Sequence, residues 1–278
     1  MRVPVGKGQH REALGLVASL PASAALRVVF TLCCTTAAFC AALLGCLTRL
    51  GGLPQAIVTD NDAGIVASRR DGTVRLVEEV AALYGTLGLR PVVLRPRFPQ
   101  GKGAVERAIG YLETSFVPLR SVASLADLQA QADAWTVQVA DQRHLRRLSA
   151  RVAEALAAER ASLRRLPERW PEVDQRLEIR ASRDGFVRVG GVDYSVPPRL
   201  AGRRLGVRLS LTEVTVSCES AEVARHARSW VPADVVLAPD HARQLRLARE
   251  AATRLAARDP HVATVDLARY DTLIEVGS

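Results

Sequence analysis

The longest uncharged stretch of the chain runs for 21 residues, from Val28 to Thr48. A stretch of this length can cross a membrane, or it can form buried elements of a globular domain. Residues 26–32 (LRVVFTL) are rich in β-branched and aromatic types, which is typical of a buried strand. We therefore predict a strand at 26–32 followed by a second element, and we keep a membrane span as the alternative.

The second half of this stretch has the signals of a helix. Thr35 and Thr36 are residues that cap helix N-termini. Apolar residues then recur at helical spacing, and the glycine at position 51 is typical of a helix end. We predict a helix over 35–50, and we expect the uncharged stretch to belong to a globular protein rather than to a membrane anchor.

Strands and helices alternate through the first 120 residues. The composition predicts strands at 14–19, 26–32, 56–59 and 92–94, and helices at 35–50, 73–87 and 104–117. Such alternation predicts an α/β core. Two helices with basic faces are expected between 121 and 166.

The character of the sequence changes near residue 176. Five short strands are predicted at 177–180, 186–189, 192–196, 205–209 and 214–218, separated by glycine and proline turns. Their spacing predicts a small β-barrel, followed by an amphipathic helix at 240–257. We accordingly divide the chain into a core (1–120), a helical connector (121–175), a β-barrel (176–235) and a C-terminal helix with its tail (236–278).

The charge of the chain favours a polyanionic partner. Its formal net charge is +9 and its isoelectric point is near 10, values typical of proteins that bind nucleic acid. Only Lys7 and Lys102 are lysines, so arginine content by itself reflects a compositional bias. The five cysteines lack the spacing of zinc ligands, and they indicate a reduced, cytoplasmic protein.

Two carboxylates occupy positions suited to metal-assisted chemistry. Asp60 follows the predicted strand 56–59, where open α/β sheets bind ligands, and Glu106 lies at the start of the predicted helix 104–117. Taken alone, Asp60 is equally well explained as a helix cap, and Glu106 is better explained by a surface ion pair with Arg107 or Lys102. Together they can hold Mg²⁺, which prefers oxygen ligands and serves phosphoryl transfer. The spacing alone therefore predicts a metal-dependent nuclease fold as one possibility.

A family resemblance makes this prediction specific. Residues 95–107 (RPRFPQGKGAVER) resemble the signature of insertion-sequence transposases of the IstA type, members of the DDE superfamily with an RNase-H-like fold. Residues 57–61 (IVTDN) resemble the strand that carries the family's second catalytic Asp, and residues 182–187 and 192–198 resemble its C-terminal β-barrel. The resemblance extends from about residue 5 to residue 270.

The resemblance implies roles for individual residues and partners. Asp60 and Glu106 would be catalytic and would bind the two Mg²⁺ ions of the family, and four basic residues would contact DNA: Arg95, Arg97, Lys102 and Arg107. The family acts on double-stranded DNA, namely transposon ends and target, as a homo-oligomer with an ATPase helper protein. The implied function is DNA integration by metal-dependent phosphoryl transfer.

The sequence also departs from the family pattern. No Asp precedes Asp60, although the family places its first catalytic Asp on the opening strand of the fold. The chain starts about where that strand should have ended, and the family's N-terminal helix-turn-helix and His-containing motif are not matched, the latter at 141–148. We therefore expect an N-terminally truncated RNase-H-like core that is inactive alone, with a non-catalytic DNA-binding remnant or regulator as the alternative.

Overall fold

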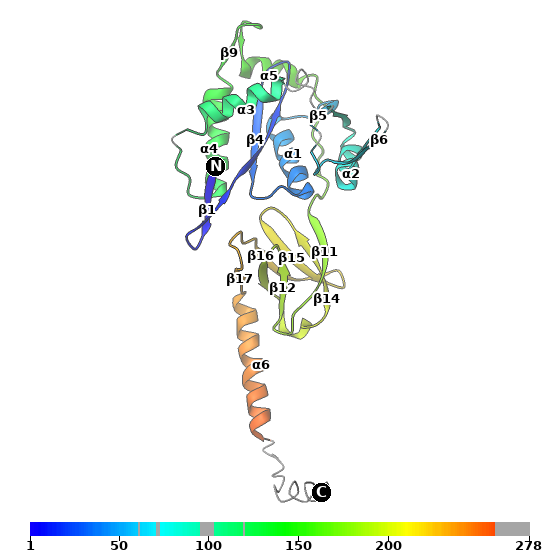
Figure 1. Cartoon of the computed structure of the whole chain (residues 1–278), viewed down its shortest axis with the longest axis vertical. Helices are drawn as coiled ribbons and strands as arrows, with labels where there is room; N and C mark the ends of the chain where they lie inside the picture. The colour runs from blue at the N-terminus through cyan, green and yellow to red at the C-terminus, as the bar shows by residue number, and fades with distance from the viewer. Residues whose placement is uncertain (61, 71–72, 95–102, 119, 259–278) are drawn as a thin grey trace, which may run out of the picture.

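The protein is a mixed α/β chain, described here from a computed structural model (Figure 1). The structure describes residues 1–278 except 61, 71–72, 95–102, 119 and 259–278. Strands and helices alternate in the N-terminal part. Strands dominate between residues 175 and 236, and one long helix follows them.

The uncharged stretch forms a strand and a helix. The strand β4 (Leu26–Thr31) is buried along its whole length and pairs antiparallel with β3 (Leu14–Ser19). The helix α1 (Thr36–Leu50) follows, capped by the Thr35 hydroxyl, which accepts a hydrogen bond from a first-turn backbone N–H. It ends at Gly51, whose φ of 83° suits glycine. These elements confirm the prediction of a strand followed by a helix.

No helix within the described residues is long and apolar enough to cross a membrane.

A second pair of strands lies further along the chain. The strands β5 (Ala56–Thr59) and β8 (Arg90–Val93) are parallel, and α2 (Glu78–Leu87) precedes β8. Between β5 and α2 the chain forms a hairpin of β6 (Val66–Arg70) and β7 (Thr73–Leu76). The prediction of one helix over 73–87 is therefore wrong in its first turn and a half.

Both strand pairs contribute side chains to the same apolar cluster around α1. Leu16 of β3 and Ile57 of β5 contact a group of buried residues that includes Leu43, Leu47 and Tyr84. Within the described residues β3 pairs only with β4, and β5 pairs only with β8. Each of these two strands therefore leaves one edge without a strand partner.

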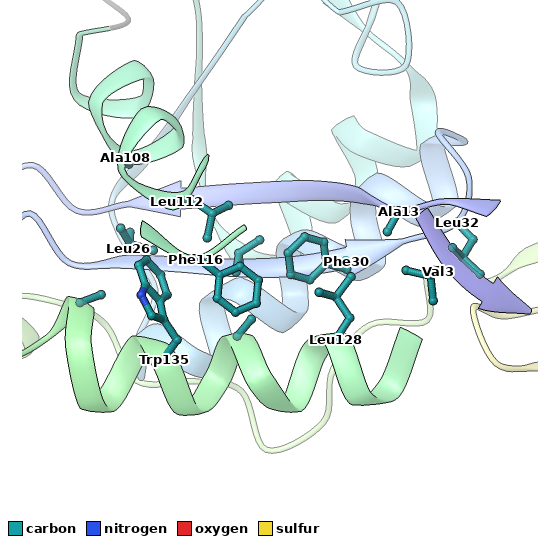
Figure 2. Packing of buried hydrophobic residues seen from close by; sticks show 13 residues of the cluster. Val3, Ala13, Leu26, Phe30, Leu32, Ala108, Leu112, Phe116, Leu128 and Trp135 are labelled. Carbon is teal, nitrogen blue, oxygen red and sulfur yellow. The ribbon is translucent and has the colours of Figure 1, made fainter. Parts of the chain in front are cut away.

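A second cluster packs helices against the other face of β4. The rings of Phe30 and Phe116 lie 6.2 Å apart, and those of Phe116 and Trp135 lie 5.4 Å apart. Figure 2 shows these rings between β4 and α4 (Leu125–Trp135). The helix α3 (Gly103–Ser115) adds Leu112 from above.

The remaining elements of the N-terminal part complete this region. They are β1 (Arg2–Gly6), β2 (Gln9–Glu12), the π-helical turn η2 (Thr136–Ala140), β9 (His144–Leu145), β10 (Ala150–Arg151) and α5 (Val152–Arg160). Two helices thus lie between 121 and 166, as predicted. The expectation that both have basic faces is wrong, because α4 contains no lysine or arginine and contains Asp127 and Asp133.

The C-terminal part holds two sheets around one apolar core. One sheet has the order β11 (Gln175–Arg180), β14 (Arg204–Leu209), β15 (Glu213–Cys218) and β16 (Ala221–Ala227). The other has the order β12 (Phe186–Val189), β13 (Val192–Ser195) and β17 (Val235–Val236). The five predicted strands are present, and the sequence analysis missed β16 and β17.

A short 3₁₀ helix, η3 (Pro198–Leu200), follows β13, and the helix α6 (Pro239–Arg258) leaves the sheets and extends away from them (Figure 1). The two parts of the protein meet at the β1–β2 hairpin. The Arg11 side chain donates to the backbone carbonyl of Trp230 at 2.7 Å, and the Trp230 ring packs against the N-terminal core.

Candidate active site

Asp60 follows directly after β5 and is exposed. Its surroundings are set by the neighbouring strand, because the backbone N–H of Leu94 donates to the carbonyl of Thr59 at 2.9 Å. The chain that leaves β8 therefore starts beside Asp60. The Arg69 side chain donates to the Leu94 carbonyl at 3.2 Å, which places a cation at the same end of the two strands. Sequence analysis did not single out Arg69.

The loop after Asp60 is fixed by its own hydrogen bonds. The carboxylate of Asp62 accepts from the backbone N–H of Gly64 at 2.7 Å, which closes a turn. The hydroxyl of Thr36, in the first turn of α1, donates to the Gly64 carbonyl at 3.1 Å. Asp62 thus has a structural role in the turn, and Asp60 is the exposed carboxylate directly after β5.

Glu106 lies in the first turn of α3, and its side chain is exposed. A carboxylate at this position is favoured by the positive end of the helix dipole. Arg107 is exposed too, and its guanidinium lies over the helix start, where a Cβ on Gly103 would be 3.1 Å from it. The first turn of α3 therefore presents one carboxylate and one guanidinium on adjacent residues.

The other predicted DNA contacts lie outside the described residues. These are Arg95, Arg97 and Lys102, which belong to the segment 95–102 between β8 and α3. Among the described residues there is no group of three or more His, Cys, Asp or Glu side chains placed to hold a metal ion. Asp60 and Glu106 therefore stay the predicted metal ligands.

Some arginines of this region form ion pairs within the protein and so stabilise the fold. The guanidinium of Arg27 is 6% exposed and makes two hydrogen bonds, of 3.0 and 2.9 Å, with the carboxylate of Asp141. Arg49 makes a similar pair with Asp133 at 2.7 and 2.9 Å, and this contact raises the pKa of Arg49. Asp141, the first residue of the poorly matched 141–148 segment, is therefore the buried partner of Arg27.

The buried thiols of α1 are poor candidates for chemistry. Burial raises the pKa of Cys40 to about 11 and that of Cys46 to about 12. A thiol is nucleophilic as the thiolate, so both groups are unreactive near neutral pH. Of the other cysteines, Cys34 is exposed and Cys33 and Cys218 are half-buried, so the expectation that the cysteines are small buried residues holds for Cys40 and Cys46 alone.

Comparison with known proteins identifies relatives of both parts of the chain. Residues 166–237 match the family model of the Mu transposase C-terminal domain. The transposase for insertion sequence element IS21 of Pseudomonas aeruginosa is 30% identical over 69% of this chain and 50% of its own length. A putative transposase of Mycobacterium tuberculosis is 34% identical over 69% of this chain and 47% of its own length.

A third curated relative and one solved structure are also similar to this chain. A putative transposase for insertion sequence IS408 of Burkholderia multivorans is 33% identical over 70% of this chain and 38% of its own length. A chain in the cryo-EM structure of a simian T-cell lymphotropic virus intasome in complex with PP2A regulatory subunit B56 gamma is similar at 18% identity, with a TM-score of 0.41. That match covers 82% of this chain and 77% of the other. The chain spans half or less of the length of these curated relatives.

Proposed function

This chain is a homologue of insertion-sequence transposases, and its relatives confirm the resemblance found in its sequence. From this premise we propose that it functions in DNA transposition. Its N-terminal part would be an RNase-H-like core, and its two C-terminal sheets would form a small barrel-like DNA-binding module. The division at 1–120, 121–175, 176–235 and 236–278 belongs to this proposal. The observation that supports it best is the match to transposases over about 70% of the chain.

The chemistry that we propose is phosphoryl transfer on duplex DNA. Asp60 and Glu106 would hold Mg²⁺, because exposed carboxylate oxygens are the hard donors that this ion prefers, and water would complete its coordination. Bound Mg²⁺ would activate the attacking oxygen and stabilise the leaving one. Arg107, beside Glu106, would pair with a phosphate of the DNA backbone, as would Arg95, Arg97 and Lys102.

A third carboxylate is expected for the full reaction. No Asp precedes Asp60 in this chain, and Asp62 is engaged in a turn. We propose that the 278-residue polypeptide by itself binds DNA but does not join it, since losing one group from a cooperative site costs orders of magnitude in rate. The second candidate, a DNA-binding regulator derived from a transposase, is favoured by the same observation. A homo-oligomer and an ATPase helper follow from the family resemblance.

The metal site can be tested without any catalytic readout. Mn²⁺ binding to the full chain, followed by electron paramagnetic resonance, should weaken at least about tenfold on Glu106→Gln or Asp60→Asn, because each change removes a charged ligand. Glu113→Gln is the matched control, since Glu113 is an exposed acid on the same helix. Equal Mn²⁺ binding by Glu106→Gln and Glu113→Gln would contradict the metal site and favour the regulator.

A further inference from the structure

The helix α6 is anchored to the β sheets at its start by a buried polar cluster. The hydroxyl of Ser195 accepts from the backbone N–H of Ala238 and shares a hydrogen bond with Nδ1 of His241, both at 2.9 Å. Nε2 of His226 lies 2.7 Å from the backbone carbonyl of Ser195. Ser195, His226 and His241 are all buried, so the first turn of α6 has a fixed position on the sheets.

Beyond this anchor, α6 presents exposed arginines whose side chains make no ion pair or hydrogen bond with other described residues. Arg246, Arg249 and Arg254 are exposed, and none of them forms an ion pair or a side-chain hydrogen bond within the part of the chain that the structure describes. Arg243 differs, because its guanidinium pairs with Asp240 at 3.2 Å. The three unpaired arginines extend over about 12 Å along the helix, given a rise of about 1.5 Å per residue.

Two further arginines lie on the segments that contact α6. A Cβ placed on Gly185 would be 3.7 Å from Pro198 and 3.9 Å from Leu245, so the turn at 182–185, η3 and α6 meet at one place. Arg183 on this turn and Arg199 on η3 are exposed, and neither has an ion-pair partner among the described residues. We define the α6 surface as Arg183, Arg199, Arg246, Arg249 and Arg254.

The α6 surface borders an open cavity of about 660 Å³, which Arg246, Arg249 and Arg254 line together with apolar residues such as Phe186. The neighbouring acids Asp184 and Glu250 form no ion pair with any described residue, and the five arginines outnumber them, so this region keeps a net positive charge. Among the described positions from 246 to 254, Leu247 is the one exposed large apolar side chain, at 57%. Protein interfaces centre on buried apolar anchors, whereas duplex DNA is held through many phosphate contacts from arginine.

We propose that the α6 surface binds the phosphate backbone of duplex DNA, separately from the carboxylates at Asp60 and Glu106. The inference rests on the proposed function in transposition and adds to it a DNA contact made by α6 and the two segments beside it. Arginine suits this contact because its planar guanidinium makes paired hydrogen bonds to phosphate oxygens. The buried cluster at Ser195 would set the angle at which α6 meets the DNA.

Fluorescence anisotropy with the full chain and a labelled duplex tests the proposal. Arg246→Ala, Arg249→Ala and Arg254→Ala combined should weaken binding at least about tenfold at low salt. The slope of log affinity against log salt should become less steep by roughly 3, about one for each phosphate that the triple variant no longer neutralises. The matched lysine triple variant should keep most of the affinity, since it keeps the charge. Arg243→Ala is the control on the same helix and should change binding less than twofold.

The outcomes separate the two proposals. If the unaltered chain does not bind duplex DNA, the function in transposition fails, and the α6 surface fails with it. If it binds and the alanine triple variant binds equally well, the α6 surface alone is wrong. If the alanine triple variant loses binding to poly-glutamate but keeps its binding to DNA, the surface binds an acidic protein instead, and the proposal is overturned. Circular dichroism of each variant checks that α6 stays helical.

Discussion

The N-terminal part and the C-terminal sheets use arginine in different ways. In the first part, Arg27, Arg160 and Arg164 donate to backbone carbonyls of elements distant in sequence, and Arg27 also holds the buried Asp141. Five arginines of the sheets instead pair with acids at or near the surface: Arg176, Arg188, Arg203, Arg208 and Arg225. The net charge of the chain is therefore a poor measure of how many arginines can bind a ligand, because many of them are engaged in contacts within the protein.

The largest effect should come from the inward arginines. Arg27→Ala leaves the buried Asp141 carboxylate unpaired, and we expect the free energy of unfolding to fall by about 3–5 kcal/mol, measured by urea denaturation. The surface change Arg225→Ala should lower the free energy of unfolding far less, because its ion pairs with Glu213 and Glu222 are exposed to solvent. Arg27→Met combined with Asp141→Leu should recover most of the loss. Equal costs for Arg27→Ala and Arg225→Ala would remove the contrast between the two regions.

An intermediate effect is expected for a buried polar group of the C-terminal part. Ser195→Ala leaves the backbone N–H of Ala238 and the ring of His241 without their shared partner, which should cost about 1–3 kcal/mol. Limited proteolysis should then cut near the start of α6 sooner than in the unaltered chain. Ser217→Ala is the control, because it removes a hydroxyl that donates to the Gly206 carbonyl in the four-stranded sheet, away from the start of α6. Unchanged cutting would show that Ser195 does not anchor α6.

The smallest of the three effects is a dependence on pH. Burial lowers the pKa of His226, and burial together with the neighbouring His226 lowers the pKa of His241. Asp240 acts in the opposite direction on His241, and Tyr194 packs against His226. The unfolded chain then binds more protons near its ordinary histidine pKa of about 6.5, so stability should decrease as the pH falls below that value.

Urea denaturation at pH 7 and pH 5 measures this dependence. His241→Gln should reduce the difference between the two pH values, because it removes one of the groups that bind protons on unfolding. His10→Gln, a change at an exposed position in the N-terminal part, should leave the difference unchanged. A pH dependence that is the same in His241→Gln and in the unaltered chain would show that His241 does not contribute to it.

Local signals were enough to predict much of the fold. The β-branched run at 26–32, the cap at Thr35 and the glycine at position 51 act within one or two turns of the chain, and the structure has the strand and helix that they predict. The hairpin β6–β7 was missed because apolar residues at 74, 77, 80 and 84 also fit a helix, and β6, the strand that pairs with β7, was not predicted. β17 has only two residues, too few for a pattern.

The candidate site was only partly accessible from sequence. Asp60 and Glu106 were found from their places after a strand and at a helix start, and the structure has them there. The roles of Arg69 and Asp141 could not be found, because each depends on a partner 25 or 114 residues away. The α6 surface was missed for a different reason: its arginines are distinguished by having no ion-pair partner within the residues that the structure describes, and this cannot be read from the sequence.

The unpaired strand edges of β3 and β5 have a consequence for the behaviour of the chain at high concentration. An open edge is a template for strand addition by another molecule, which promotes aggregation. The outer edge of β8 is protected, because Pro91 lies where the backbone would otherwise donate outward, while Arg90 and Leu94 donate toward β5. The edges of β3 and β5 have no such proline, and Leu14 of β3 is 41% exposed. Self-association through these two strands is therefore the first cause to consider if the chain precipitates.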